Sequence, residues 1–207
     1  MAEAGQFGNP QFELTGGALC LDFANTSPDH KAPETSSEKI HTYAELLTFE
    51  VQAGALPVTD ARNLLAAASH ANGKGAAVTR SARELREILY RIFAAAASER
   101  KPSREDVEAF NRFLGEALRH TRLVPNSPAF KREWDDPASL QRPLWPIVSS
   151  AAELMTGEQF GFVRQCESER CSWLFIDRSR NRTRRWCNMK VCGNRAKARR
   201  HYQRVKD

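Results

Sequence analysis

The stretches Cys166-Glu-Ser-Glu-Arg-Cys171 and Cys187-Asn-Met-Lys-Val-Cys192 each place four residues between two cysteines, and fifteen residues separate the two pairs. In structural sites Zn²⁺ is bound by four tetrahedral thiolates at about 2.3 Å, and two short loops can supply such ligands with little backbone strain. The spacing therefore predicts one structural zinc ion held by Cys166, Cys171, Cys187 and Cys192. Because all four ligands are protein sulfurs, no position is left for a water molecule, and catalytic zinc is not expected.

Two alternative roles for these cysteines stay open, namely two disulfide bonds or unrelated buried thiols. The N-terminal sequence MAEAGQFGNP lacks a basic segment followed by an apolar one. We therefore expect no secretion and a cytoplasmic location, where disulfides are rare. No apolar run approaches the roughly 18 residues of a membrane span, so no membrane partner is expected. The fifth cysteine, Cys20, is expected to be a small buried core residue.

The residues around the cysteines predict a hairpin and a helix. Residues 172–176 predict a strand, residues 178–181 a turn, and the residues leading to Cys187 a return strand. After Cys192 we expect a helix that packs through an apolar stripe of Ala198, Tyr202 and Val205. The first knuckle (residues 166–171), the hairpin, the second knuckle (residues 187–192) and the helix make a treble-clef-like zinc finger. Metal binding would contribute folding free energy on the order of 10 kcal/mol.

Charge is divided unevenly along the chain. The 207 residues carry a formal charge of +6, but residues 160–207 hold 14 Lys and Arg against 4 Asp and Glu, a net +10, which leaves −4 for residues 1–159. Guanidinium groups bind phosphate bidentately and can read guanine in the major groove, so this segment predicts a nucleic-acid partner. The alternative is a solvated charged face. The candidate contact residues are Arg178, Arg180, Arg182, Arg184, Arg185, Arg195, Lys197, Arg199, Arg200 and Arg204.

Residues 1–159 predict a mostly helical domain with a little β structure. Alternating apolar residues within 12–23, around Gly16 and Gly17, predict a short β-hairpin, and residues 122–134 carry a weaker hairpin pattern. Helices are expected to begin at the capping box of Ser81 and at Ser103. The predicted fold class is α+β, with a mostly helical N-terminal domain containing a short β-hairpin (1–159) followed by a small treble-clef-like zinc finger (160–207).

Three polar residues follow the first predicted hairpin, namely Asp22, Asn25 and Thr26. They could line a small-molecule pocket, but such residues more commonly form hydrogen bonds within turns, and we favour that role. The chain contains no phosphate-binding loop and no nucleophile elbow of the Gly-x-Ser-x-Gly type. Nothing in the sequence therefore argues for catalysis, and we expect a protein that is not an enzyme.

Two longer motifs resemble known families. The run Arg184-Arg-Trp-Cys-Asn-Met-Lys-Val-Cys-Gly-Asn-Arg195 resembles the CGNR zinc finger, whose name spells residues 192–195, and Phe175-Ile-Asp-Arg-Ser179 is similar to its preceding strand and turn. The run Gly16-Gly-Ala-Leu-Cys-Leu-Asp-Phe-Ala-Asn-Thr26 is similar to the opening motif of the ABATE domain that precedes this finger.

These resemblances imply a stress-induced transcription regulator with a DNA-binding, treble-clef-like finger. They assign the ligand role to the same four cysteines, and they mark Arg184, Arg185, Asn194 and Arg195 as motif positions. We expect Gly193 to permit a tight turn, Asn194 to cap the helix that follows, and Arg195 to assist a phosphate bound at the N-terminus of that helix.

The favoured hypothesis is a transcription regulator whose finger binds duplex DNA, while the N-terminal domain senses a small-molecule effector or dimerises. A homodimer would double the few base contacts that one finger can make. One alternative is an RNA-binding protein, because Trp173, Trp186 and Tyr202 lie among the arginines and exposed rings stack on unpaired bases, although we expect these rings to be buried. The other alternative is a ligand-sensing or interaction protein whose finger is only structural.

Overall fold

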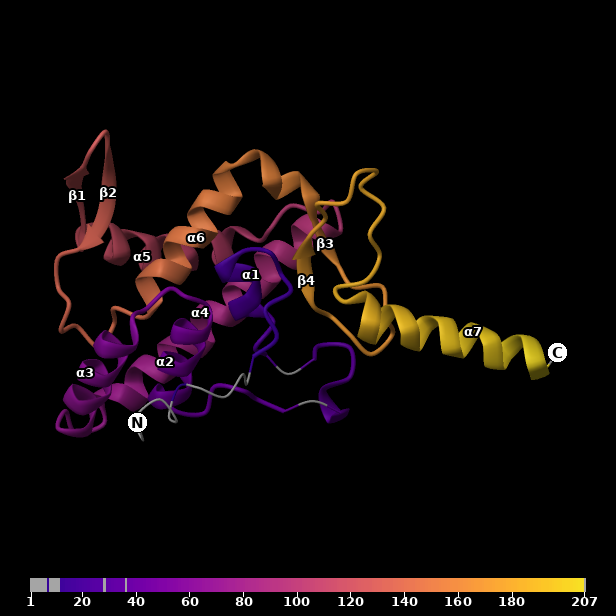
Figure 1. Ribbon diagram of the computed structural model, residues 1–207, viewed down its shortest axis with the longest axis horizontal. Helices are drawn as coiled ribbons and strands as arrows, with labels where there is room; N and C mark the ends of the chain where they lie inside the picture. Colours follow the sequence, from indigo (N-terminus) through magenta and orange to yellow (C-terminus); the bar gives the residue numbers. More distant parts are fainter. Residues whose placement is uncertain (1–6, 8–11, 28, 36, 207) are drawn as a thin grey trace.

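The protein is a helical body with a β-hairpin at one end and a long C-terminal helix extending from the other (Figure 1). The computed structural model describes residues 7, 12–27, 29–35 and 37–206; the side chains of residues 35, 200 and 204–206 lie outside the description. The helices are α1 (Leu19–Ala24), α2 (Tyr43–Gln52), α3 (Val58–Ser69), α4 (Lys74–Ala97), α5 (Arg104–Arg119), α6 (Leu144–Thr156) and α7 (Asn194–Lys206). The strands are β1 (Thr121–Asn126), β2 (Ala129–Trp134), β3 (Val163–Gln165) and β4 (Leu174–Ile176).

Helix α4 lies at the centre of the body and contacts α1, α2, α3, α5 and both strands β3 and β4. Its buried face includes Leu85, Leu89 and Phe93, as the apolar periodicity predicts. The predicted start at Ser81 is wrong, because the helix begins two turns earlier, after Gly73, whose φ of 77° is the left-handed conformation that glycine accepts readily. The predicted start of α5 is confirmed, since the hydroxyl of Ser103 accepts the N–H of Asp106 at 3.0 Å.

The hairpin predicted within residues 12–23 is wrong, because residues 19–24 form the short helix α1. Cys20, Leu21, Phe23 and Ala24 are all buried, and this i, i+1, i+3, i+4 pattern belongs to one face of a helix. Leu21 and Phe23 belong to this buried face, and together with the partly buried Leu19 they also alternate, which is why the stretch resembled a strand. The expected core role of Cys20 is confirmed, since its side chain is fully buried.

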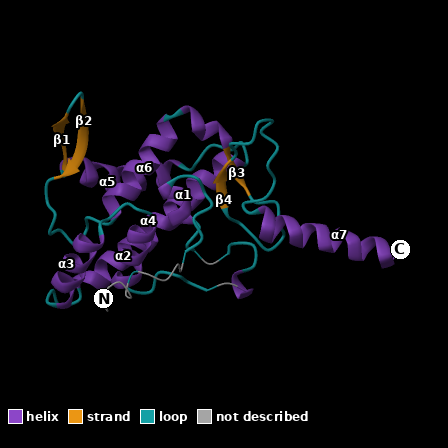
Figure 2. Cartoon of the chain, viewed as in Figure 1, coloured by secondary structure: helices purple, strands orange, loops and turns teal. Residues whose placement is uncertain are grey.

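The weaker hairpin pattern near residues 122–134 is confirmed. Strands β1 and β2 pair antiparallel from Thr121 opposite Trp134 to Asn126 opposite Ala129. Figure 2 shows this hairpin standing apart from the short β3–β4 pair, at the opposite end of the helical body. The predicted class, a mostly helical N-terminal region with a β-hairpin followed by a small cysteine-rich unit, is therefore confirmed.

Strand β4 pairs with β3, not with a return strand before Cys187, so the hairpin predicted over residues 172–187 is wrong. The pairing is antiparallel, with Val163 opposite Ile176, and the first knuckle forms its connection. Leu174 and Ile176 join Val163 in the core of the helical body, whereas Phe175 packs against the four cysteines. Pairing with β3 thus lets the alternating side chains of β4 serve two cores at once.

The free edge of β4 is covered by the N-terminal segment. The carbonyl of Gly16 accepts the N–H of Ile176 at 2.8 Å. The side chain of Asn25 pairs with both backbone groups of Leu174: its Oδ1 accepts the N–H at 2.7 Å, and its Nδ2 donates to the carbonyl at 2.9 Å. These bonds satisfy buried backbone groups that a third strand would otherwise pair.

Helix α7 extends away from the body (Figure 1), and among the described elements its main packing partner is the π-helical turn Met189–Gly193 that precedes it. The predicted packing stripe is wrong for Ala198 and Tyr202, which are exposed, Tyr202 to 70%. The side chain of Val205 lies outside the described ones. None of the described helices is long and apolar enough to cross a membrane.

The Asn25 bridge yields a stability prediction. Replacing Asn25 by Ala leaves the buried N–H and carbonyl of Leu174 without partners, which should lower the free energy of unfolding by about 2–4 kcal/mol. Urea unfolding of the zinc-loaded protein measures the change. Asn111→Ala on the exposed face of α5 is the matched control and should change stability little. Equal stability of the two variants would contradict the assignment.

Candidate metal centre

The four cysteines of the two knuckles converge on one point. Cys166 follows β3 directly, Cys171 lies just before β4, Cys187 ends the intervening loop, and Cys192 lies in the π-helical turn before α7. Their four sulfurs all lie within 4.8 Å of one another, and all four residues are buried. The structure thus brings together the four residues that the sequence spacing singled out.

The sulfur positions fit a tetrahedral zinc ion. Four sulfurs at about 2.3 Å from a central metal would be about 3.8 Å apart. The Sγ atoms of Cys171 and Cys187 are 3.6 Å apart, and those of Cys187 and Cys192 are 3.7 Å apart. The donor set consists of sulfur alone, which suits Zn²⁺ and leaves no ligand position open. A four-cysteine cluster of this geometry supports one structural Zn²⁺, and it argues against unrelated buried thiols.

The electrostatics of the cluster also favour a bound cation. Hydrogen bonds from the thiols of Cys171 and Cys187 lower the pKa of Cys166 well below its ordinary value. The contact with Cys166 raises the pKa of Cys171 and, together with Cys171, that of Cys187. One thiolate therefore forms readily, while further negative charge is opposed by the first. Zn²⁺, when bound, would supply the positive charge that lets all four sulfurs act as thiolates.

The backbone and Lys31 hold the first knuckle in place. The N–H groups of Ser168 and Cys187 point at the sulfur of Cys166. From the N-terminal segment, the ammonium of Lys31 donates to the carbonyls of Cys166 at 2.6 Å and Ser168 at 3.4 Å. Nearby, Asp29 accepts the N–H of Ser172 at 2.9 Å. Sequence reasoning missed Lys31 and Asp29, because no local pattern marks a contact across more than 130 residues.

The second knuckle uses its motif residues differently from the prediction. Asn188, not Asn194, caps the helical turn, since its Oδ1 accepts the N–H of Lys190 at 2.9 Å. Asn194 is already helical, and its Nδ2 donates to the carbonyl of Lys190 at 3.0 Å. Gly193 serves close packing, because a Cβ there would lie 2.4 Å from the sulfur of Met189.

Asp177 organises the loop between β4 and the second knuckle. It lies in the Phe175–Ser179 run, but no local sequence pattern predicts this role. Its carboxylate accepts the N–H and hydroxyl of Ser179 at 2.9 and 2.6 Å, and the N–H of Arg184 at 2.9 Å. Its carbonyl accepts from the guanidinium of Arg182, which also lies 3.8 Å over the ring of Phe162. The loop is therefore ordered by polar contacts instead of a strand pairing.

Several of the candidate nucleic-acid contacts have partners within the protein. Arg184 donates to the carbonyls of Trp186 and Cys187, and its guanidinium lies 4.4 Å over the ring of Phe175, so it braces the metal centre. Arg178 donates to the carbonyl of Gly17 at 2.9 Å. Ion pairs join Arg185 to Glu167 and Arg199 to Glu169.

Three other candidate cations lack an ion-pair partner among the described residues. Arg180, Arg195 and Lys197 are exposed, and none of them has an ion pair within the part of the chain that the structure describes. The side chains of Arg200 and Arg204 lie outside the described ones. Nucleic-acid contact by any of the ten residues stays a prediction.

The aromatic residues of the finger are not all buried as expected. Trp173 and Trp186 are half-buried and pack against the cysteine cluster, and cations cover them, Lys39 at 5.2 Å and Arg185 at 5.2 Å from the ring centroids. Tyr202 is exposed on α7.

The three residues predicted to line a ligand pocket or support a turn all have partners in the protein. Asp22 accepts the N–H of Gly16 at 2.7 Å, and burial raises its pKa to about 6. Asn25 pairs with Leu174 as described above, and the hydroxyl of Thr26 donates to the carbonyl of Phe23 at 2.7 Å. None of the three lines either of the two clefts beside the cysteines. A ligand pocket at these residues stays a prediction.

Comparison with protein families gives two matches. The ABATE family model, described as "Putative stress-induced transcription regulator", matches residues 17–158. The CGNR zinc-finger model matches residues 163–205, which include all four cysteines. No curated protein matches the chain.

The metal centre predicts a loss of zinc on removal of one ligand. Cys192→Ser should reduce the metal content from about one Zn²⁺ per chain to a small fraction of that, because three sulfurs bind zinc far less tightly than four. Metal analysis of protein purified without chelator measures the content. Cys20→Ala, at the fifth cysteine, is the control and should retain the metal. Full zinc in the Cys192 variant, or little zinc in the wild-type protein, would contradict the site.

Proposed function

The chain belongs to the ABATE family of transcription regulators and carries a C-terminal CGNR zinc finger, and from that premise we propose that the finger binds duplex DNA. A zinc finger in a transcription regulator implies nucleic-acid binding, and the family implies a protein that is not an enzyme. The choice of duplex DNA, and the residues that contact it, are our proposal.

One observation carries the proposal: the start of α7 presents two exposed cations that have no carboxylate partner among the residues described by the structure. Arg195 lies in the first turn of this helix and borders both clefts beside the cysteines, and Lys197 follows it on the exposed surface. The zinc centre fixes where α7 begins, so these cations are presented at defined positions. Phosphate groups are the natural partners of such guanidinium and ammonium groups.

The shape of α7 supports a duplex partner. The helix extends away from the body (Figure 1), and its described side chains from Lys197 to Gln203 are all exposed. Helices of this length are marginally stable alone in water, and a major groove admits one α-helix. A second copy of so basic a helix would be repelled, whereas a polyanionic groove would be attracted. We therefore place α7 along the groove.

Single-stranded RNA is a weaker candidate for this surface. Sequence-specific recognition of unpaired bases relies on exposed aromatic rings. Trp173 and Trp186 are half-buried and covered by cations, which leaves Tyr202 as the exposed ring among the aromatic residues of the finger that the structure describes. One ring offers little stacking surface.

For the N-terminal helices we propose the sensing of a small-molecule effector or dimerisation. A cleft of about 560 Å³ lies between the N-terminal loop and the knuckles, with Asp29 and Lys39 on one side and Cys171 and Arg195 on the other. An effector in this cleft would touch both parts, and Lys31 already joins them through the first knuckle. This arrangement supports a ligand-sensing role, and it is also compatible with a homodimer formed through the N-terminal helices. We propose a cytoplasmic location for such a regulator.

DNA binding should depend steeply on salt. If about six phosphates are contacted, the logarithm of the association constant should fall with the logarithm of salt concentration with a slope of about −5. Fluorescence anisotropy with a labelled duplex, using zinc-loaded protein, measures this slope. A flat salt dependence would contradict the proposal, and clear preference for a matched single-stranded RNA would favour the RNA-binding alternative.

Arg195 should contribute directly to DNA affinity. Arg195→Ala should weaken duplex binding by about tenfold, since a hydrogen bond to a charged group is worth about 1.5 kcal/mol. Arg112→Ala removes an exposed arginine of α5 and is the matched control, for which little change is expected. Zinc content is measured for both variants, to show that the finger is intact. Equal affinity of the two variants would place the DNA surface elsewhere.

A further inference from the structure

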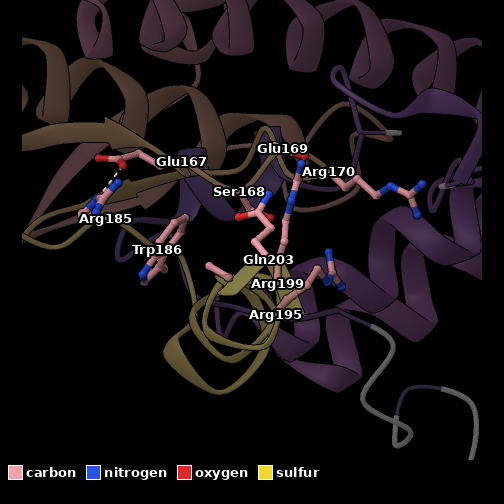
Figure 3. A pocket seen from close by; sticks show the side chains of 10 residues that line it. Glu167, Ser168, Glu169, Arg170, Arg185, Trp186, Arg195, Arg199 and Gln203 are labelled. Carbon is pink, nitrogen blue, oxygen red and sulfur yellow. Dashed lines mark hydrogen bonds and ion pairs between the residues drawn. The ribbon is translucent and has the colours of Figure 1, made fainter. Parts of the chain in front are cut away.

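A second cleft, of about 670 Å³, lies between the first knuckle and the start of α7, and four arginines border it (Figure 3). Arg170 comes from the first knuckle, Arg185 from the loop before the second knuckle, and Arg195 and Arg199 from α7. Three segments that are held together by the zinc ligands therefore bring four arginines to the border of one cleft, with Arg185 and Arg170 on opposite sides of it (Figure 3). Four positive charges around one cleft favour the binding of an anion.

Two glutamates of the first knuckle neutralise part of this positive charge. The Nε of Arg185 lies 2.5 Å from Oε2 of Glu167, and Arg199 forms an ion pair with Glu169. Figure 3 shows the Arg185–Glu167 pair on one side of the cleft and Arg199 extending from α7 toward Glu169. Arg170 and Arg195 have no carboxylate within ion-pair distance among the described residues, so the cleft keeps a net positive charge.

Both ion pairs are exposed to solvent and are easily exchanged. The side chains of Glu167 and Arg185 are 48% and 59% exposed, and those of Glu169 and Arg199 are 68% and 55% exposed. Pairs of this kind contribute little to stability. A phosphate group offers a guanidinium the same planar pair of oxygens as a carboxylate, with additional charge. An incoming phosphate can therefore replace each glutamate without disturbing the fold.

We propose that this cleft binds backbone phosphates of DNA, and that Glu167 and Glu169 are internal competitors which occupy Arg185 and Arg199 until the phosphates displace them. The inference rests on the proposed function and adds to it a control of affinity. The two glutamates lower the affinity for any duplex by a constant factor. Weak encounters with DNA of arbitrary sequence are therefore suppressed, while a site that makes further base contacts is still bound.

The test is the double variant Glu167→Gln/Glu169→Gln, which keeps the side-chain shape and removes both carboxylate charges. Its affinity for a duplex of arbitrary sequence at low salt should rise about tenfold, because each exposed pair accounts for about a factor of three. The matched control is Glu84→Gln/Glu99→Gln, which removes the same charge from exposed carboxylates in and just after α4. Its affinity should rise less than about twofold, through screened long-range attraction alone.

A double-mutant cycle separates release of the arginines from a general charge effect. In a background of Arg185→Ala/Arg199→Ala, the two Glu→Gln changes should no longer increase affinity. A rise that persists without the arginines, or one equal to that of the control pair, would overturn the inference while duplex binding itself stands. If neither the wild-type nor the control protein binds duplex DNA, the proposed function fails, and the inference fails with it. Zinc content and urea unfolding of all variants should match the wild type.

Discussion

The convergence of four cysteine sulfurs within 4.8 Å is the constraint on which the C-terminal part of the molecule depends. It ties the β3–β4 hairpin, the loop organised by Asp177 and the start of α7 to one point. The regular structure among these described residues is limited to two short strands of three residues each, the π-helical turn and α7, and the cysteines pack against buried Phe175 and two half-buried tryptophans. Because a zinc ion would cross-link the two knuckles, the position of every basic side chain around α7 follows from that centre.

The finger is also attached to the helical body and does not merely follow it in sequence. Leu174 and Ile176 lie in the core built around α4, Asn25 pairs with the free edge of β4, and Lys31 binds two carbonyls of the first knuckle. A change in the N-terminal segment therefore has a direct physical route to the zinc ligands. In a transcription regulator, such direct contacts could transmit a signal from the N-terminal segment to the finger.

Sequence patterns were sufficient where the determinant is local. The cysteine spacing predicts the metal ligands, because a tetrahedral sulfur site is a property of two short loops, and the cap at Ser103 and the β1–β2 hairpin are similarly local. Sequence patterns failed where the local structure depends on a residue that lies far away in the chain. Strand β4 pairs with β3, which is too short to show alternation, and the amide of Asn25 binds a residue 149 positions away. The pattern of α1 was ambiguous, since Leu21 and Phe23 fit both the alternation of a strand and the buried face of a helix.

The net charge of residues 160–207 overstates the basic surface that is free to bind a partner. The net +10 of residues 160–207 does not lie on one free surface, because Arg182 and Arg184 brace the fold, and Arg185 and Arg199 are paired with glutamates. Arg195 and Lys197 lack such partners among the described residues and lie on α7. The nucleic-acid surface that we propose is therefore smaller than the sequence predicts, and its unpaired cations lie at the start of this helix.

Hydrogen–deuterium exchange of the zinc-loaded protein, with and without a saturating short duplex, tests most directly whether the zinc-held surface binds DNA. Binding by the zinc-held surface predicts slower exchange in residues 167–171 and 185–203, where the first knuckle and α7 meet, and unchanged exchange in the β1–β2 hairpin. Protection confined to the N-terminal helices or to that hairpin, with α7 unaffected, would contradict the account.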